Sequence, residues 1–511
     1  MRRLDAWSAL MSTLAVAACG TPAIDSMPPN AGQPWQPATA ADGAIVTGTR
    51  KSTNGAMASS YVLPPNRALG IFAPPPSSID PQHAYTLAEL IDIAQSSHPE
   101  TRVAWDDARR AALAEGIAES LYLPHVSASV IGGVRSTHGR QSAGDLGAEG
   151  SASSSGAIVA LSLEWLVFDF GQREAIVESA QQVSIASNIA FTAAHQQVIH
   201  KVCLAFYAND AARARVTIAT TALKNAQEIE AAAEDRYRRG VGTVIDLAQA
   251  RQATAQARLG DVQARGRAQD AMMALITAMG VSPLTRFNVV DVSRRKLSRA
   301  SLQPVEGIIS DAISRRPDVL GAYAAEKARE AAARAAEADF KPKIFMSATG
   351  AHASGHLDAT AVPPVGQQSG TFNLSGGHWG STVLFGVTVP LYDGGLRKST
   401  LGQARAATDA ATAMSEHVRD EAVREIVMAK NALETSLEAN EAAEALESAA
   451  HITFDAAFDA YAQGVGTTTA VTVAATQLLQ AQAAVVDAHS TALSAAATLA
   501  FATGALGDAP I

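Results

Sequence analysis

The sequence predicts a mainly α-helical protein with a small antiparallel β part, built as two structural repeats. Three observations indicate this fold class. The same turn occurs twice, as YRRGVGT (237–243) and YAQGVGT (461–467), 224 positions apart. A very long stretch without proline precedes each turn, and two pairs of segments with alternating apolar residues precede those stretches. We therefore expect two helical hairpins with equivalent tips, because a long internal repeat is one folding unit copied.

Other landmarks keep the same spacing between the two halves. Asp169 and Asp393 are again 224 positions apart, whereas the upstream prolines of the two halves are 218 apart: Pro99 and Pro317, and Pro124 and Pro342. One loop of the second half is therefore about six residues longer, and it lies between Pro342 and Asp393.

Length and charge limit the class of protein. The chain has 511 residues, 17% charged residues, 5% aromatic residues and a net charge of −9. That length alone would suggest about three domains, but two interlocked halves explain the repeat better. The negative charge gives no reason to expect a nucleic-acid partner.

The N-terminus has the pattern of a bacterial export signal. Two arginines precede an apolar stretch over 9–18 that is too short to span a bilayer. It ends in Val16-Ala17-Ala18-Cys19, which resembles a lipobox and makes Cys19 the predicted lipidated residue. The alternative is ordinary signal-peptide cleavage beside an incidental cysteine. If Cys19 is lipidated, only Cys203 remains, which excludes an intrachain disulfide.

The chain is expected to divide into five parts. Residues 1–18 are the signal peptide and 19–83 a tether rich in proline and serine, with little regular structure expected. The other three parts are a first repeat over 84–281 (tip 237–246), a linker over 282–303 and a second repeat over 304–507 (tip 461–470).

Helices of two lengths are predicted in each repeat. In the first, a helix over 87–97 begins with a capping box of Thr86 and Glu89, and another follows over 100–122. The longest runs from 172 to about 236, or about 95 Å. The return helix (244–279) is about 54 Å long and the 100–122 helix about 35 Å, so the two end to end match the long one. The second repeat predicts equivalent helices over 318–340, 397–460 and 468–503.

Strands are predicted near 125–135, 157–168, 343–351 and 381–391. Each has about the length of a tilted membrane strand and alternates apolar with small or polar residues. Aromatic residues gather where the second strand of each pair ends, as in an interfacial girdle: Trp165, Phe168, Phe170 and Tyr392. The alternative is a soluble hairpin that packs on the helices.

Membrane strands would require an oligomer. Four strands cannot close a barrel, and an open strand edge in lipid leaves unpaired backbone groups that cost several kcal/mol each. Three chains would give 12 strands and an open lumen, whereas the interior of an eight-stranded barrel would fill with side chains. The expected architecture is a trimer whose 12-strand transmembrane β-barrel joins coiled-coil α-barrel hairpins.

This ordered set of motifs resembles the TolC-like outer-membrane efflux protein family, over about residues 85–507. The matching stretches are 85–129, 315–348, the strand exits FDFGQR (168–173) and LYDGGLRK (391–398), and both GVGT tips. The resemblance implies a trimeric, lipid-anchored duct in the bacterial outer membrane with a periplasmic helical tunnel. Its implied partners are a periplasmic membrane-fusion (adaptor) protein, an inner-membrane RND or ABC transporter and outer-membrane lipid.

In that family the tips form the periplasmic entrance and contact the adaptor. Carried over, the docking residues are Gly240, Val241, Gly242, Thr243, Gly464, Val465, Gly466 and Thr467. Glycine permits the tight reversal and leaves the backbone accessible to a partner. The alternative is that these glycines only make the turn.

The gate candidates are Arg236, Arg238, Arg239, Asp246, Val471 and Val473. The arginines lie at a helix C-terminus, where cations suit the dipole, so a structural role is the alternative to pairing with Asp246 or a neighbouring protomer. Family members often carry Asp after the second tip, whereas 467–476 has no carboxylate. The entrance is therefore expected to close by apolar contact of the two valines, or not tightly.

No catalytic constellation, cofactor motif or metal pair is recognised in the sequence, so an enzyme is not expected. The function hypothesis is a passive exit duct of a tripartite efflux pump or a type I secretion system. A lipobox and the RRPD motif (315–318) favour a proton-driven exporter as the pump. The alternative function is a lipid-anchored periplasmic coiled-coil scaffold without a pore.

Overall fold

The computed structural model describes residues 35, 37–49, 62–63, 65–70, 79–141, 148–292, 297, 305–355 and 378–506. The chain forms two compact units. The smaller comprises Met1–Asp80 with Ser282–Arg286, and the larger comprises Pro81–Val281 with Phe287–Ile511. The predicted signal peptide, Cys19 and much of the predicted linker lie outside the described residues.

The smaller unit contains some regular structure, where the sequence indicated little. Strand β1 (Pro37–Thr39) pairs antiparallel with β2 (Ile45–Thr49), and a short 3₁₀ helix, η2, spans Arg67–Gly70. The turn between the strands depends on Gly43, which has φ +87° and lies so close to Pro65 that a Cβ atom would be 2.5 Å from its carbonyl oxygen.

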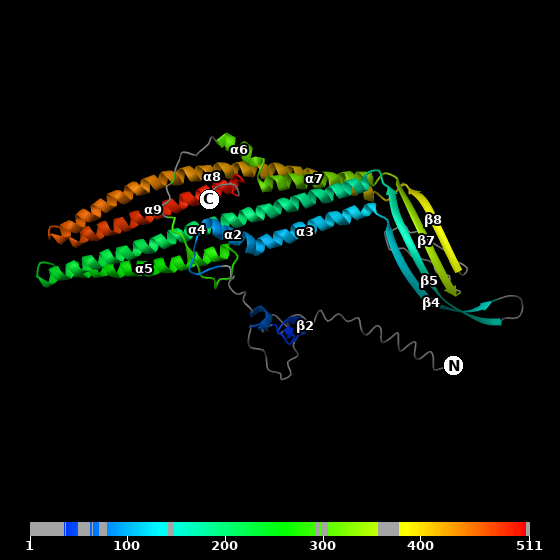
Figure 1. The fold of residues 1–511 in the computed structure, drawn as a ribbon, viewed down its shortest axis with the longest axis horizontal. Coiled ribbons are helices and arrows are strands. Elements are labelled where there is room, and N and C mark those ends of the chain that lie inside the picture. The colour runs from blue at the N-terminus through cyan, green and yellow to red at the C-terminus, as the bar shows by residue number, and fades with distance from the viewer. Residues whose placement is uncertain are drawn as a thin grey trace. The chain divides into compact units, whose positions relative to one another are not determined.

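The larger unit presents the same succession of elements twice (Figure 1). The first succession is α2 (Leu87–Ser97), α3 (Pro99–Glu119), β4 (His125–Gln141), β5 (Ala148–Phe168), α4 (Gln172–Arg238) and α5 (Val244–Ala278). The second is α6 (Val305–Ile313), α7 (Pro317–Ala338), β7 (Lys343–Gly355), β8 (His378–Thr388), α8 (Leu396–Ala462) and α9 (Thr468–Ala502). The short strands β3 (Ala84–Tyr85) and β6 (Asn288–Val289) form a separate parallel pair.

Local signals place the helix boundaries. Thr86 accepts the backbone N–H of Glu89 while the Glu89 carboxylate accepts that of Thr86, so the predicted capping box is present. His98 accepts the N–H of Glu100 through Nδ1, and Pro99 is the first residue of α3. That helix ends at Glu119 rather than 122, because the last turn tightens into a 3₁₀ helix, η3 (Ser120–Tyr122).

The two 67-residue helices, α4 and α8, form the length of the helical body. Figure 1 shows α3 and α5 following one another along α4, as the helix lengths predicted, and α4 also packs against α7 and α9. Small residues allow this close packing. In α7 the buried side chains recur at helical spacing as Ala324, Ala328, Ala331 and Ala335, and Ser179 of α4 donates to the Ala328 carbonyl at 2.9 Å.

Among the residues that the structure describes, one helix, α9, is long and apolar enough to cross a membrane by length and composition alone. It packs instead along α8 and α4 within the helical body.

The four-stranded sheet is antiparallel, in the order β4–β5–β7–β8. Strands β4 and β5, with 17 and 21 residues, are longer than predicted, because their pairing continues through small and polar residues that show no apolar alternation. β8 lies three residues earlier than the predicted 381–391, since it stops before Pro390, which has no N–H to donate to a ladder.

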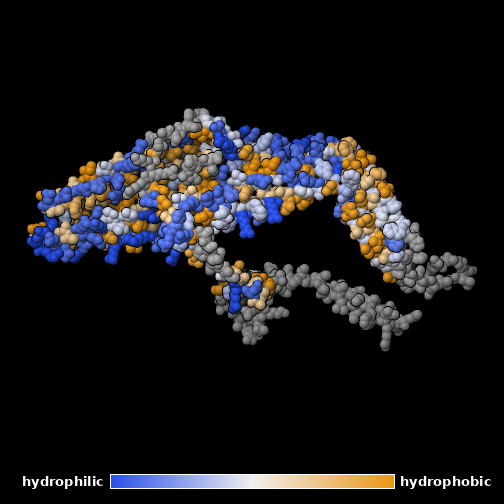
Figure 2. Space-filling model, viewed as in Figure 1, coloured by the Kyte–Doolittle hydropathy of each residue, from blue (hydrophilic) through white to orange (hydrophobic). Residues whose placement is uncertain are grey.

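The register places apolar residues of all four strands on one face. Val126 lies opposite Leu163, which lies opposite Ala348, which lies opposite Val383. The next row along the same face continues with Trp165, Met346 and Phe385. The other face is mixed: it carries the polar side chains of Ser127, Ser162, Glu164, Ser347, Thr349 and Thr382, together with Ile158, Phe345 and Leu384. Figure 2 shows apolar side chains gathered over the strands.

Candidate functional site

The two helical tips have the same backbone geometry. In the first, the N–H groups of Val241 and Gly242 both donate to the Arg236 carbonyl, at 3.0 and 3.1 Å. In the second, Val465 and Gly466 donate to the Ala460 carbonyl at 3.0 and 2.9 Å. These bonds satisfy carbonyls at the helix ends, so the tips are ordered turns that end one helix and aim the next.

The glycines of each tip serve two different needs. Gly240 and Gly464 have φ values of +75° and +86°, the left-handed conformation that ends the helix. Gly242 and Gly466 lack space instead: a Cβ on Gly466 would lie 2.8 Å from the backbone nitrogen of Tyr461. Docking by these residues stays a prediction, but their role in the turn follows directly from the geometry.

Each GVGT turn presents one exposed valine. Val241 is 67% exposed and Val465 is 81% exposed. Thr243 and Thr467, which follow them, cap the return helices by accepting the N–H groups of Asp246 and Ala470 at 3.1 and 3.2 Å. The free apolar surface at the end of the helical body is therefore supplied by these two valines together with Val244 and Ile245 at the start of α5, which are 64% and 65% exposed.

Asp246 is the second half of a capping box rather than the partner of an arginine. Its carboxylate accepts from the Thr243 hydroxyl at 2.7 Å and from the Thr243 N–H at 3.0 Å. These two bonds lower the pKa of Asp246, and the Thr468 hydroxyl and the nearby Arg236 charge lower it further. The second tip has Ala470 at this position, so the missing carboxylate of the second repeat is a missing capping residue.

Arg236 connects the two hairpins at the tip. Its Nη1 donates to the Tyr461 carbonyl at 3.1 Å, and its guanidinium lies 5.1 Å from the centre of the Tyr461 ring. Tyr461 is 2% exposed and its hydroxyl accepts from Thr468 at 3.3 Å. The first-repeat counterpart, Tyr237, is 46% exposed. The contact therefore runs from an arginine of the first hairpin to a buried tyrosine of the second, and Tyr237 is not buried in an equivalent way.

The other gate candidates lie in different surroundings. Arg238 and Arg239 form ion pairs with Glu234 and Asp235 one turn earlier in α4. Val471 is fully buried, in an apolar cluster with Ile229, Ala233, Leu247, Phe454, Tyr461 and Leu478. It holds the hairpins together and presents no surface to another chain, which corrects the expectation that it closes the entrance. Val473 is 50% exposed and remains accessible.

Above this cluster, α4, α5 and α9 enclose a groove of about 600 Å³. Its lining contains no charged side chain and alternates small apolar residues with amides and hydroxyls, among them Ala226, Gln249, Gln256, Thr472, Val473 and Thr476. The groove therefore offers neutral hydrogen-bonding groups and no charge.

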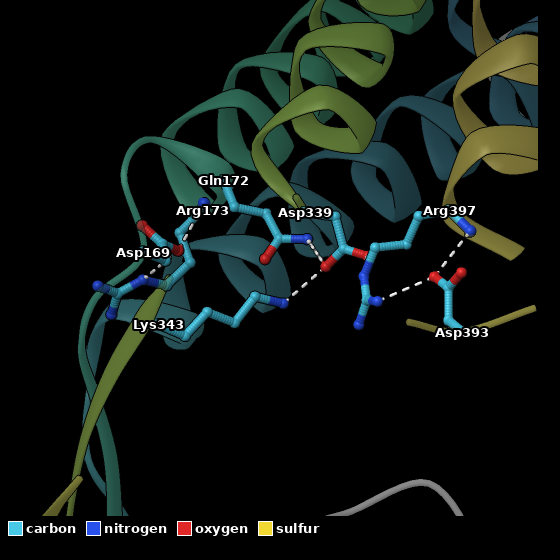
Figure 3. A network of polar contacts seen from close by, with 7 residues as sticks. All are labelled: Asp169, Gln172, Arg173, Asp339, Lys343, Asp393 and Arg397. Carbon is cyan, nitrogen blue, oxygen red and sulfur yellow. Dashed lines mark hydrogen bonds and ion pairs between the residues drawn. The ribbon is translucent and has the colours of Figure 1, made fainter. Parts of the chain in front are cut away.

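A polar network fixes the strands to the helices at the opposite end of the body (Figure 3). Asp169 and Arg173 form a buried ion pair at 2.9 Å, and Arg173 also donates to the carbonyls of Leu121, Leu166 and Val167. This one guanidinium ties the end of β5 to the segment before β4.

The second repeat uses the same motif in a more exposed position. Arg397 pairs with Asp393 at 2.9 Å and with Asp339 at 3.1 Å, and Asp339 also accepts from Lys343 and Gln172. Burial opposes ionisation of Asp339, but the bond and charge of Lys343 prevail and lower its pKa. Gln172 belongs to the first repeat, so this carboxylate joins both repeats.

The predicted aromatic girdle lies beside these exits. Trp165, Phe168, Phe170 and Tyr392 are 36%, 48%, 42% and 92% exposed. Phe170 has φ +56°, a conformation that disfavours any residue but glycine, and the second repeat has Gly394 at that position. Its ring contacts Phe168 edge-on at 4.7 Å.

Sequence reasoning did not single out Arg173, Arg397 or Asp339 as functional residues, although the FDFGQR and LYDGGLRK exits contain two of them. Their equal spacing was a usable signal. Within the described part of the chain, no group of three or more metal-ligating side chains is present. Cys203 is buried, and burial raises its pKa to about 11, as expected of an unreactive thiol.

Paired tips, long side-by-side helices and a sheet with one apolar face define an outer-membrane channel subunit. The model of the family described as outer membrane efflux protein matches residues 90–281 and 308–505. The chain belongs to this family, and it is a protein of the outer membrane.

Two relatives and one solved structure show the extent of the similarity. The chain is 26% identical over 380 residues to outer membrane protein OprJ of Pseudomonas aeruginosa, which covers 74% of this chain and 75% of OprJ. It is 27% identical over 346 residues to protein CyaE of Bordetella pertussis, 68% of each chain. A solved membrane protein from P. aeruginosa has a TM-score of 0.69 at 25% identity and covers 82% of this chain and 90% of that one.

Proposed function

We propose that the chain is the outer-membrane exit duct of a tripartite efflux pump or a type I secretion system. Three copies share one 12-strand barrel, and their helical bodies continue it as a tunnel in the periplasm. The observation that carries this proposal is the sheet, with a continuous apolar face and with β4 and β8 at its two edges. In lipid both edges require a partner, so β4 of one copy pairs with β8 of the next.

The more polar of the two faces of the sheet supports an aqueous lumen. Its serine and threonine side chains, with Glu164, suit water, whereas the apolar face suits lipid. Three chains enclose an open lumen and two would not. Lipidation of Cys19 adds an anchor that is independent of the strands.

The duct conducts passively, and the energy comes from the inner-membrane pump, an RND or an ABC transporter. The lipobox favours a proton-driven RND exporter. The RRPD motif supports that choice less, because Arg316 is buried and donates to Asp318, Glu425 and the Ala502 carbonyl, which gives the motif a structural part.

The tips dock a periplasmic adaptor through Val241 and Val465. The two valines are the exposed apolar residues of otherwise bare Gly–Thr turns, which lets a partner helix approach the backbone. Between them, Arg236 acts as the gate contact, because its bond to Tyr461 holds the two hairpins of one chain together at the entrance.

Single-channel conductance of the purified oligomer in planar bilayers tests the duct. We expect discrete conductance steps from the wild type and larger or more frequent openings from Arg236→Ala, with Arg239→Ala as a matched control. Correctly inserted but electrically silent protein would favour the lipid-anchored scaffold without a pore.

Docking is tested in cells with Val241→Asp and Val465→Asp, which change the tip surface without touching its hydrogen bonds. We expect loss of pump-dependent export with unchanged oligomer levels. Export at the wild-type rate from the double variant would contradict adaptor docking at the tips. The substrates of an inner-membrane pump encoded by a neighbouring gene would identify the cargo.

A further inference from the structure

Two helices at the tip end of the body leave faces without a partner in the single chain. Helix α5 packs on α4 and α8 packs on α9, yet both expose large apolar side chains. Ile245 and Val262 of α5 are 65% and 62% exposed, and Leu446 and Ile452 of α8 are 54% and 68% exposed. Apolar groups in such numbers indicate a surface that another chain covers.

The two helices carry opposite charge. The tip half of α8, residues 431–462, contains seven Asp and Glu residues and no Lys or Arg. Helix α5 carries arginines at a spacing of seven, which places them in one stripe: Arg251, Arg258 and Arg265. All three side chains are exposed. The acidic residues of α8 nearest the middle of that half recur every three or four residues, the spacing of one helix face: Glu434, Glu438, Glu441, Glu444 and Glu447.

The internal repeat provides a template for how such helices meet. Within the chain, α4 runs antiparallel to α9, and four hydrogen-bonded pairs define the register: Gln196 with Gly504, His200 with Thr498, Tyr207 with Ser490 and Arg215 with Asp487. The two residue numbers of each pair add to a value between 697 and 702. Adding 224 to the number of an α4 residue gives the equivalent residue of α8, and subtracting 224 from the number of an α9 residue gives the equivalent residue of α5. The two changes cancel, so equivalent pairs of α8 and α5 residues have the same total.

Applied to two copies of the chain, this register brings the opposite charges together. Arg251 meets Glu447 (total 698), Arg258 meets Glu441 and Glu444 (699 and 702), and Arg265 meets Glu434 (699). At the tip end, exposed Ile245 meets exposed Ile452 (697). Nothing in the repeat required the charges to match, because α4 and α9 do not carry this pattern.

We propose that α8 of one copy packs antiparallel on α5 of the next, with the acidic stripe facing the arginine stripe. This inference rests on the proposed oligomeric duct and names the surface that closes it. The interface is heterologous, because one copy contributes α8 and the next contributes α5, so each chain uses two different surfaces. Charge complementarity therefore directs the chains into a ring and fixes their register more than it adds affinity.

Arg258 is the sharpest point at which to test the interface. Arg251 and Arg265 have intrachain ion pairs, with Glu230 at 3.6 Å and Asp261 at 2.9 Å. Among the described side chains, Arg258 forms no ion pair of its own, so reversing its charge disturbs little within one copy. Arg267, nine residues on and therefore on the opposite side of α5, is exposed and provides a control with the same change of charge.

The first measurement is the ratio of oligomer to monomer in detergent at low salt, by light scattering. We expect Arg258→Glu to lower it about tenfold, since a closed ring contains the mismatch several times, and Arg267→Glu to leave it unchanged. Glu441→Arg with Glu444→Arg in the same chain should restore it. The second measurement is disulfide formation between copies of Arg258→Cys, Glu441→Cys in a Cys203→Ala background, with Arg267→Cys replacing Arg258→Cys as control.

The outcomes separate the inference from the function on which it rests. A wild-type protein that is monomeric in every detergent overturns the shared duct. A stable wild-type oligomer in which Arg258→Glu behaves as Arg267→Glu, or in which both cysteine pairs cross-link equally, overturns only the proposed interface. Loss of oligomer in Arg258→Glu that the compensating change restores supports it.

Discussion

Replacing Arg173 by alanine is expected to destabilise the junction between strands and helices more than any equivalent change in the second repeat. The Arg173 and Asp169 side chains are only 8% and 6% exposed, and the guanidinium is bonded to three backbone carbonyls as well as to the carboxylate. Removing it leaves the buried Asp169 carboxylate without its counter-charge, with one backbone N–H as its remaining donor there, and takes a donor from three carbonyls. Breaking such a buried pair costs about 3–5 kcal/mol.

The repeat offers a matched comparison in the same molecule. Arg397 and Asp393 are 29% and 24% exposed, so water can replace much of what Arg397→Ala removes. We expect a loss of about 1–2 kcal/mol there, near that of hydrogen bonds to a charged group. Arg173→Lys should recover only part of the Arg173→Ala loss, because an ammonium cannot reach all four acceptors at once.

Thermal unfolding of the detergent-solubilised protein, followed by circular dichroism, measures the difference. The melting temperature should fall clearly further for Arg173→Ala than for Arg397→Ala, and Asp169→Asn combined with Arg173→Ala should recover part of the loss because it removes the orphaned charge. Equal shifts for the two arginines would refute the reasoning that burial sets the magnitude.

Three further predictions follow from single contacts. Phe170→Gly should stabilise the protein by about 1 kcal/mol and so raise its melting temperature in detergent, since Phe170 adopts the left-handed conformation that Gly394 adopts in the second repeat. A lower melting temperature would mean that the aromatic contact outweighs the strain. Gly466→Ala should open the second tip, because the added Cβ would lie 2.8 Å from a backbone atom. This overpacking should cost about 1–3 kcal/mol of stability, and limited proteolysis at the tip should become faster. Finally, burial holds the pKa of His98 below its ordinary value of 6.5, and the neutral ring accepts the Glu100 N–H, so its stabilising effect is present above pH 6.5 and declines as the pH falls below it. The difference in unfolding free energy between the wild type and His98→Asn should therefore stay constant above pH 6.5 and shift against the wild type as the pH falls further, and a pH-independent difference would exclude this.

Much of the fold could be predicted from local sequence. Two tips 224 residues apart, capping residues such as Thr86, and helix lengths that match end to end indicate two helical hairpins with little need for tertiary information. Signals of this kind act within a few residues, so they survive in the sequence. Strand extent was harder to predict, because the hairpin of β4 and β5 continues through small and polar residues whose pairing comes from register and not from alternation.

The site depended more on packing than on pattern. Val471 and Val473 are two residues apart on one helix, yet one is fully buried between hairpins and the other half-exposed. Likewise, Asp246 and Arg236 look like an ion pair in sequence, whereas Asp246 caps its own helix and Arg236 reaches the other hairpin. The sequence by itself determined the duplication, the helices and the turns, since these are local. Only the tertiary structure decided which face of each helix is covered, because that depends on neighbours far away in the chain.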